Sequence, residues 1–362
     1  MKRIAVIGLR GFPGVQGGVE KHCEHLMPRL SRHMECIIYR RKPYLSAESS
    51  TDIPGIRYVD LPSSRIKGVE ALMHTLLSVL NLPMHKVDAV NVHNIGPGLF
   101  TPLLRLMGYN VVLTYHSPNY EHAKWGRFAR LILKTGEALA LKFSNRIIFV
   151  NRFQLEKYPE NIRRKSVYIP NGVDQAQPTD DTDFLDRHGI KPGQYVLAVG
   201  RITPEKGFEH LIKAVDTVPE VQQLVIAGGC DHDSEFLHRL KTLDRAGKVI
   251  FTGLTDAQGL RQLYSHARMF VLSSVNEGFP LVMLESMSYA LPMTVSDIPA
   301  THLIELPEES YFPVADTTVM ADRIKTLYTK GLHRVNYNLD EFSWDNVAAG
   351  TLDVYSSIIP NR

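Results

Sequence analysis

Short runs of apolar residues, separated by longer stretches with helical periodicity, recur along almost the whole chain. In the first half they lie at residues 3–8, 36–40, 88–93, 110–116 and 146–150. In the second half they lie at residues 195–200, 223–228, 248–253 and 269–274. The runs are rich in Val and Ile and alternate little with polar residues, which is typical of strands covered on both faces. The pattern predicts an α/β protein with parallel sheets built from βαβ units.

The chain length favours two domains. A chain of 362 residues exceeds one average domain and suits two, each able to bury its own core. The Asn171-Gly172 turn and the polar segment after it have linker composition. We therefore expect two doubly wound, Rossmann-like domains, 1–170 and 171–340, that face one another across a cleft, followed by a C-terminal helix at 341–362.

The charge is distributed unevenly. Residues 1–170 hold 25 Lys and Arg against 12 Asp and Glu, a balance of +13, and the rest hold 16 against 26, a balance of −10. A basic half suggests an anionic partner such as acidic lipid head groups, pyrophosphate or nucleic acid. The basic clusters at 40–42 and 163–165, taken singly, are interpreted as solvated loops.

Composition excludes several classes of protein. With 44% hydrophobic and 22% charged residues, the chain is that of an ordinary globular protein. It has no apolar run near the ~20 residues of a membrane helix and no signal-peptide layout, so we expect a cytoplasmic protein. Three widely spaced cysteines without a CxxC pair argue against a disulfide framework and a structural zinc site.

The loop after the first strand is rich in glycine. It resembles a dinucleotide-binding motif, but Arg10 stands where that motif needs glycine. Gly17 and Gly18 precede a helix, where backbone N–H groups and the helix dipole favour an anion; a flexible turn is the alternative. The helix is expected to bury one face, formed by Val19, Cys23, Leu26, Met27 and Leu30.

Two further loops in the second half could bind a ligand. Arg201 and Lys206 leave one strand-to-helix turn together, as a diphosphate without a metal would need; two solvated cations are the alternative. Glu277 follows the strand at 269–274, beside a helix N-terminus, and Glu285 is expected about two turns into that helix. An acidic residue there suits a ribose diol, and the alternative is a capping glutamate plus an exposed one.

These segments, in this order, resemble the retaining nucleotide-sugar glycosyltransferases of family 4, which have the GT-B fold. The resemblance covers nearly the whole chain and includes IPNGVD at 169–174, LAVGRITPEKGFEHLIKA at 197–214, EGFPLVMLE at 277–285 and the terminal FSWDNVAAGTLDVYSSI. The opening GLRGFPGVQGGVEKH and residues 123–150 look most like the subgroup that builds bacterial surface polysaccharides, including rhamnosyltransferases.

The resemblance implies a role for each matching residue. Gly17 and Gly18 would bind the donor's phosphates from the first domain, Arg201 and Lys206 would hold its diphosphate, and Glu285 would bind the ribose. The segment Gly278, Phe279, Pro280 and Leu281 would contact the donor sugar and phosphate. His116 and Glu277 would lie near the sugar as positioning and electrostatic groups. The C-terminal helix would pack back toward the first domain.

The implied reaction moves a hexose of the glucose, mannose, GlcNAc, galactose or rhamnose type from a nucleotide-diphosphate sugar. The acceptor would be a glycan or an undecaprenyl-pyrophosphate-linked saccharide, bound by the first domain. No metal or other cofactor is expected, and Asp231-His232-Asp233 is interpreted as a surface loop. A mixed basic and apolar helix predicts peripheral contact with the inner face of an anionic membrane; its residues are Lys124, Trp125, Arg127, Phe128, Arg130, Leu131 and Lys134.

Rival interpretations predict other behaviour. A GT-B epimerase or phosphorylase is the nearest enzymatic rival, and a phosphorylase would need a pyridoxal-phosphate lysine context that the chain does not show. The rival from another class is a basic nucleic-acid- or membrane-binding protein with an inactive GT-B scaffold. Nucleic-acid affinity would fall steeply with salt, and the acidic second half would have no use. We therefore expect no nucleic-acid partner.

Overall fold

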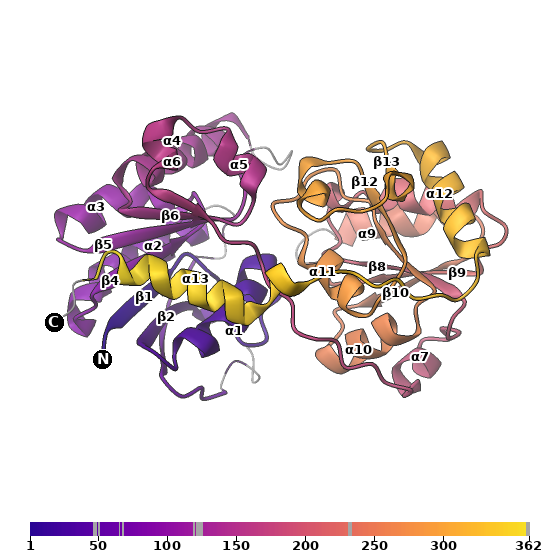
Figure 1. Cartoon of the computed structure of the whole chain (residues 1–362), viewed down its shortest axis with the longest axis horizontal. Coiled ribbons are helices and arrows are strands. Elements are labelled where there is room, and N and C mark those ends of the chain that lie inside the picture. Colours follow the sequence, from indigo (N-terminus) through magenta and orange to yellow (C-terminus); the bar gives the residue numbers. More distant parts are fainter. Residues whose placement is uncertain are drawn as a thin grey trace. The chain divides into compact units, whose positions relative to one another are not determined.

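The chain folds into two compact α/β units (Figure 1). The computed structural model describes residues 1–45, 49, 51–64, 66, 69–118, 120, 126–230 and 234–359. The first unit comprises Met1–Gly172 and Phe342–Arg362, and the second comprises Val173–Glu341. The chain therefore passes between the units twice, at 172–173 and at 341–342, one or two residues after the expected boundaries.

The first unit is built on a seven-stranded sheet in the order β3-β2-β1-β4-β5-β6-β7, and the pairings are all parallel. The strands are β1 (Arg3–Ile7), β2 (Glu35–Arg41), β3 (Ile56–Leu61), β4 (Ala89–His93), β5 (Asn110–Tyr115), β6 (Arg146–Phe149) and β7 (Ser166–Tyr168). The strand order reverses at β1, between β2 and β4. Ligands of doubly wound sheets bind at the carboxyl ends beside such a reversal.

Helices cover this sheet, and two of them come from opposite ends of the chain. The C-terminal helix contacts the first helix, and Figure 1 shows them side by side in yellow and indigo. Contacts also join the third and fourth helices on the sheet. The helices of the unit are α1 (Gly18–Leu30), α2 (Val69–Asn81), α3 (Thr101–Leu106), α4 (Arg127–Phe143), α5 (Arg152–Glu156), α6 (Glu160–Arg163) and α13 (Trp344–Ser356).

The second unit repeats the plan with a six-stranded parallel sheet in the order β10-β9-β8-β11-β12-β13. Its order reverses at β8, between β9 and β11. The strands are β8 (Tyr195–Val199), β9 (Gln223–Ala227), β10 (Val249–Gly253), β11 (Met269–Leu272), β12 (Met293–Ser296) and β13 (Tyr311–Phe312). The helices are α7 (Asp183–Arg187), α8 (Phe208–Asp216), α9 (Ser234–Leu243), α10 (Ala257–His266), α11 (Leu281–Ser288) and α12 (Thr317–Thr329).

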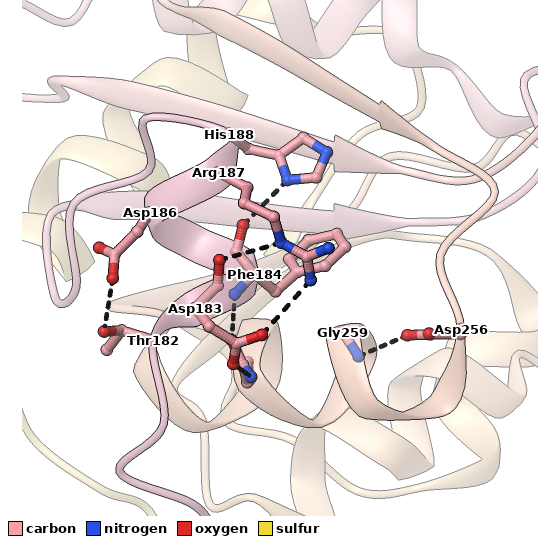
Figure 2. Close-up of polar contacts among 9 residues, drawn as sticks. Thr182, Asp183, Phe184, Asp186, Arg187, His188, Asp256 and Gly259 are labelled. Atoms are coloured by element: carbon pink, nitrogen blue, oxygen red, sulfur yellow. Dashed lines mark hydrogen bonds and ion pairs between the residues drawn. The ribbon is translucent and has the colours of Figure 1, made fainter.

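Helix α7 is attached to α10 by polar contacts, shown in Figure 2. The backbone N–H of Phe184 donates to Gln262 Oε1 over 2.8 Å, and the Phe184 ring lies against Gly259, where a Cβ would come within 2.7 Å of it. Asp256 caps α10 by accepting from the Gly259 N–H over 2.7 Å. These contacts fix α10, which carries Tyr264 toward the candidate site described below.

All nine strands expected from the apolar runs are present, so the expectation of two doubly wound α/β units is confirmed. The expectation missed β3, β7, β12 and β13. Strands β3, β7 and β13 lie at sheet edges, and β7, β12 and β13 have two to four residues each. Edge strands are short and half-exposed, so their composition is less apolar than that of central strands.

Two local expectations were wrong. Val19 is only half-buried, because Glu20 and His22 occupy the buried face of α1 with Cys23 and the leucines. Helix α11 begins at Leu281, so Glu285 lies little more than one turn inside it.

Candidate active site

The loop after β8 carries the two cations that the sequence assigns to a diphosphate. Arg201 is half-buried, and Lys206 ends the short 3₁₀ helix Pro204–Lys206. The lysine stem lies against Gly200, where a Cβ would come within 3.2 Å of Lys206 Cε. At Gly207, φ is +65° and a Cβ would lie 2.1 Å from the Ser273 carbonyl oxygen. Glycine at these positions allows the loop to lie close to the lysine and to the neighbouring strand end.

Lys206 forms an ion pair with Glu277, from the loop after β11. Lys206 Nζ lies 2.6 Å from Glu277 Oε1, and the two side chains are 16% and 14% exposed. Ser274 Oγ donates to the same carboxylate oxygen over 2.6 Å. Ser273 Oγ donates to the Lys206 carbonyl oxygen over 2.8 Å. The structure thus brings together two predicted site residues that are 71 positions apart, with two serines that the sequence analysis did not name.

Glu285 is oriented by a tyrosine from α10. Tyr264 OH donates to Glu285 Oε2 over 2.9 Å, and the Tyr264 ring stacks on Tyr289 with centroids 5.3 Å apart. Burial raises the pKa of Tyr264 well above its usual value, and the neighbouring Glu285 carboxylate adds to the effect. The tyrosine therefore remains a hydrogen-bond donor at neutral pH and fixes the carboxylate.

The segment from Gly278 to Leu281 leads directly into α11. Phe279 and Pro280 are buried, Pro280 is the N-cap, and Leu281 is the first helical residue. The first N–H groups of a helix have no partner within the helix and carry the positive end of its dipole. This end of α11 can therefore interact with a phosphate or with sugar hydroxyl groups.

In the first unit, the predicted anion loop ends at Gly17, the N-cap of α1, and Gly18 is the first helical residue. A Cβ at Gly17 would lie 2.0 Å from Glu20 Oε2, whereas one at Gly18 would meet nothing within 4 Å. Glu20 is buried, and its Oε1 accepts from the Arg10 N–H over 2.9 Å. Sequence reasoning missed the Glu20 carboxylate, which lies at the N-terminus of α1 beside Gly17. The N-terminus of α1 remains open on the side of Gly18.

The two arginines of the basic cluster at 40–42 are buried, which corrects the interpretation of this cluster as a solvated loop, whereas Lys42 is exposed. Arg40 is 5% exposed and makes a bidentate ion pair with Asp60 at 2.7 and 2.9 Å. Its Nη1 also donates to the carbonyl oxygens of Phe12 and Ser49. Arg41 is equally buried, and its backbone N–H donates to the Arg10 carbonyl over 2.8 Å. These arginines therefore hold the glycine-rich loop in place.

His116 follows β5 directly and belongs to a buried cluster of three histidines. His93, the last residue of β4, places Nδ1 3.0 Å from His116 Nε2. His22 of α1 lies edge-on to the His116 ring, with centroids 5.0 Å apart. Burial lowers the pKa of all three rings, His22 to about 4, and their mutual repulsion lowers the pKa of His93 and His116 further. All three imidazoles are therefore neutral at pH 7.

The third histidine is held by the segments that lead between the units. His22 Nδ1 lies 2.8 Å from Asn171 Oδ1, and its ring lies edge-on to Trp344, the first residue of α13. Gly172 is packed so closely on Trp344 that a Cβ would come within 2.6 Å of the indole. Sequence reasoning missed His22 and His93. His93 could have been predicted, because it ends a strand that pairs with the strand before His116.

Two family models match the chain. The model described as Glycosyltransferase Family 4 matches residues 16–177, and the model described as Glycosyl transferases group 1 matches residues 193–330. Among curated relatives, the chain is 31% identical to the uncharacterized glycosyltransferase MJ1607 of Methanocaldococcus jannaschii over 44% of each chain. It is 24% identical to alpha-maltose-1-phosphate synthase of Mycolicibacterium smegmatis over 98% of this chain and 99% of that one.

Further relatives and solved structures are similar. O-antigen chain mannosyltransferase B of Escherichia coli is 26% identical over 52% of this chain and 51% of its own length. Sucrose-phosphate synthase from Thermosynechococcus elongatus superposes with a TM-score of 0.81, 22% identity and 99% coverage of both chains. Anabaena HepE in complex with UDP-glucose gives a TM-score of 0.78 at 16% identity, over 99% of this chain and 100% of that one.

These comparisons define the class of the protein. The fold of both units is that of the GT-B glycosyltransferases. Both family models describe glycosyltransferases, one over most of the first unit and one within the second, and together they support a glycosyltransferase of the family-4 type.

Proposed function

We propose that the protein is a retaining, metal-independent hexosyltransferase that uses a nucleotide-diphosphate sugar to extend a lipid-linked or saccharide acceptor of a cell-surface polysaccharide. The observation that carries the proposal is the Lys206–Glu277 pair at the carboxyl ends of β8 and β11. The pair supports the proposal because a lysine suits a phosphate, a carboxylate suits sugar hydroxyls, and doubly wound sheets bind ligands at this edge.

The ion pair prepares Lys206 for a phosphate. A lysine ammonium has three N–H donors, and one of them points to Glu277. The other two can contact the donor's diphosphate together with Arg201, so that charge growing on the leaving group is stabilised in the transition state. The carboxylate of Glu277 can accept from a sugar hydroxyl while it holds the lysine.

Other residues contact the remaining parts of the nucleotide-sugar donor. Glu285, oriented by Tyr264, binds the ribose hydroxyls, and the backbone from Gly278 to Leu281 contacts the sugar and its phosphate. In the first unit, the backbone at Gly17 and Gly18 serves the phosphates, and the space they would occupy lies on the open Gly18 side. His116 contacts the sugar as a neutral imidazole, since its pKa is lowered by burial, and so orients the sugar without acting as an acid.

The acceptor is proposed to be a growing glycan on an undecaprenyl-pyrophosphate carrier. O-antigen mannosyltransferases are among the relatives, and the sequence of the opening loop resembles the surface-polysaccharide subgroup with its rhamnosyltransferases. The +13 balance of residues 1–170 suits an acidic carrier and an anionic membrane surface. No helix in the described parts of the chain is both long and apolar enough to cross a bilayer.

A panel of UDP-, GDP- and dTDP-sugars tests the proposal, with thermal stabilisation and slow donor hydrolysis as readouts in a buffer that contains a chelator. One nucleotide series should stabilise the protein, and its sugar should be released first with the anomeric configuration of the donor, followed by proton NMR. A folded protein that no member of the panel stabilises would refute the proposal. Release of the opposite anomer would refute retention.

A further inference from the structure

The buried histidine cluster of the first unit has the geometry of a metal-ligand set. One ring nitrogen each of His22, His93 and His116 lies within 4.8 Å of the corresponding nitrogens of the other two. His93 is fully buried, His22 is 3% exposed and His116 is 8% exposed. The cluster is thus almost closed to solvent, and His116 is its most exposed member.

His22 is held in the tautomer that a metal ligand requires. The Asn171 carbonyl oxygen can only accept, so the Nδ1 that lies 2.8 Å from it must carry the ring proton. In a neutral imidazole, Nε2 then has a free lone pair, and this nitrogen is buried without a hydrogen-bond partner among the described residues. Ligating histidines typically donate their other N–H to a carbonyl or carboxylate in this way.

His93 and His116 share one proton between His93 Nδ1 and His116 Nε2, which lie 3.0 Å apart. Zn²⁺–N bonds of about 2.0–2.1 Å in a tetrahedral arrangement place ligand nitrogens about 3.4 Å apart. The pair would therefore separate by about 0.4 Å around an ion, while the His22 nitrogen moves inward. The ring that held the shared proton moves it to its other nitrogen, so no proton needs to leave the cluster.

We propose that His22, His93 and His116 bind a Zn²⁺ ion through three imidazole nitrogens, with a fourth position left for water or a hydroxyl group. Neutral imidazoles suit zinc, and three protein ligands with one open position are a common zinc arrangement. The described metal-ligand set contains no carboxylate, which disfavours Mg²⁺ and Ca²⁺.

The ion would oppose the reaction. Zn²⁺ would occupy Nε2 of His116, the residue that the proposed function assigns to the donor sugar, so its binding should inhibit transfer. The inhibition rests on the proposed function, whereas binding of the ion does not. Transfer itself stays metal-independent, because the cations for the diphosphate are Arg201 and Lys206 of the second unit.

The binding test uses the full chain, stripped of metal with a chelator and titrated with Zn²⁺ against a chromophoric competitor. We expect one ion per chain, and X-ray absorption of the loaded wild-type protein should show three imidazole shells with Zn–N distances of about 2.0–2.1 Å. The wild-type spectrum needs no variant, so it stays decisive if a variant fails to fold. An oxygen-only shell, or no binding, would overturn the proposal.

Variants assign the ligands. His22→Gln and His93→Gln should each weaken Zn²⁺ binding at least about 100-fold, and Asn171→Ala should weaken it about 10- to 100-fold by releasing the His22 tautomer. The matched control is His25→Gln, three residues along α1, where the ring stacks on Trp344 outside the cluster. Its affinity should equal that of wild type. Equal Zn²⁺ affinities of His22→Gln and His25→Gln would contradict the assignment of His22 as a ligand.

The effect of Zn²⁺ on activity is then measured with the nucleotide sugar that the panel identifies as the donor. Donor hydrolysis should fall as Zn²⁺ saturates the wild-type protein and recover when the chelator is added. If Zn²⁺ binds without lowering donor hydrolysis, the inhibitory role is wrong, while the assignment of the metal site stands. Failure of every nucleotide sugar to bind would refute the proposed function, while the Zn²⁺ titration and the absorption spectrum would still decide the metal site.

Discussion

At the scale of single residues, the candidate site depends on side chains that hold other side chains. Glu277 and Gly200 fix the position of the Lys206 ammonium, Tyr264 fixes Glu285, and Asn171 fixes the tautomer of His22. Glu277, Tyr264 and Asn171 lie 71, 21 and 149 positions along the chain from the residues that they hold, and each can be removed by a small substitution. The predictions at this scale therefore concern the partners.

Tyr264→Phe should weaken donor binding about tenfold, since hydrogen bonds to charged groups contribute about 1.5–3 kcal/mol. The substitution removes only the hydroxyl that donates to Glu285 Oε2, so the ribose contact is loosened while the stacking on Tyr289 is kept. The KM for the donor should rise more than kcat falls. Tyr337→Phe, which removes a hydroxyl that donates to the Leu291 carbonyl, is the control. Equal KM values for the two variants would contradict the role of Tyr264.

Acid should destabilise the first unit through its buried histidines. Burial, and then the neighbouring Arg41, lower the pKa of His74 from 6.5 to about 4. The unfolded chain therefore binds the proton first, and the stability that His74 contributes is full above pH 6.5 and is lost as the pH falls from 6.5 toward 4.

For this single group the loss between pH 8 and pH 5 is about 2 kcal/mol. Urea unfolding of His74→Gln should show a smaller drop in the free energy of unfolding over that interval than wild type does. His188→Gln, at the half-buried C-cap of α7 in the second unit, is the control. An unchanged pH dependence in His74→Gln would show that this histidine is not buried as a neutral ring.

At the scale of elements, helix α4 exposes apolar and basic side chains together. Phe128 and Leu131 are 76% and 62% exposed, and Arg127, Arg130 and Lys134 on the same helix are also exposed. The alternative to membrane contact is an ordinary amphipathic helix whose apolar side belongs to the core, and this exposure excludes that alternative for Phe128 and Leu131. Lys124 and Trp125, which the sequence analysis included, lie outside the described residues, as does the segment 231–233.

The double substitution Phe128→Ser and Leu131→Ser should reduce binding to phosphatidylglycerol vesicles at least about tenfold, because burying either side chain in the interface contributes on the order of 1–3 kcal/mol. Binding of wild type should weaken with salt, which screens the attraction of the basic residues to anionic lipid. The measurement is vesicle flotation. Leu254→Ser, a 70% exposed leucine of the second unit, is the control. Equal flotation of the double variant and wild type would contradict membrane contact by α4.

The sequence predicts elements well where their residues are apolar and fully buried. It predicts them poorly where burial depends on a polar partner elsewhere in the chain. The central strands could be predicted, because apolar runs covered on both faces leave a strong signal. The edge strands β3, β7 and β13 could not be predicted, since their half-exposed residues weaken the apolar signal of a strand. The arginines at the end of β2 look solvated in the sequence and are buried, because Asp60 and two carbonyl oxygens neutralise and saturate Arg40. Glu20 was missed for the same reason: its partner is a backbone N–H.

At the scale of the whole molecule, each unit places its chemistry at the carboxyl ends of a parallel sheet. In the second unit this edge holds Lys206, Glu277 and the approach to α11; in the first it holds the glycine loop and the three histidines. The two glycosyltransferase family models match the two halves separately, at residues 16–177 and 193–330. The contacts that orient the side chains of the site come from residues such as Tyr264 and Asn171, which lie in other segments.

The most direct test of this account is a calorimetric titration of the purified chain with UDP, GDP and dTDP, without divalent cation and with a chelator present. One nucleoside diphosphate should bind with one site per chain. Lys206→Ala should keep the fold and weaken that binding at least about tenfold, since a charged hydrogen bond to the diphosphate is lost, whereas the exposed Lys213→Ala on α8 should bind as wild type does. Binding that needs a divalent cation, or that Lys206→Ala leaves unchanged, would contradict the account.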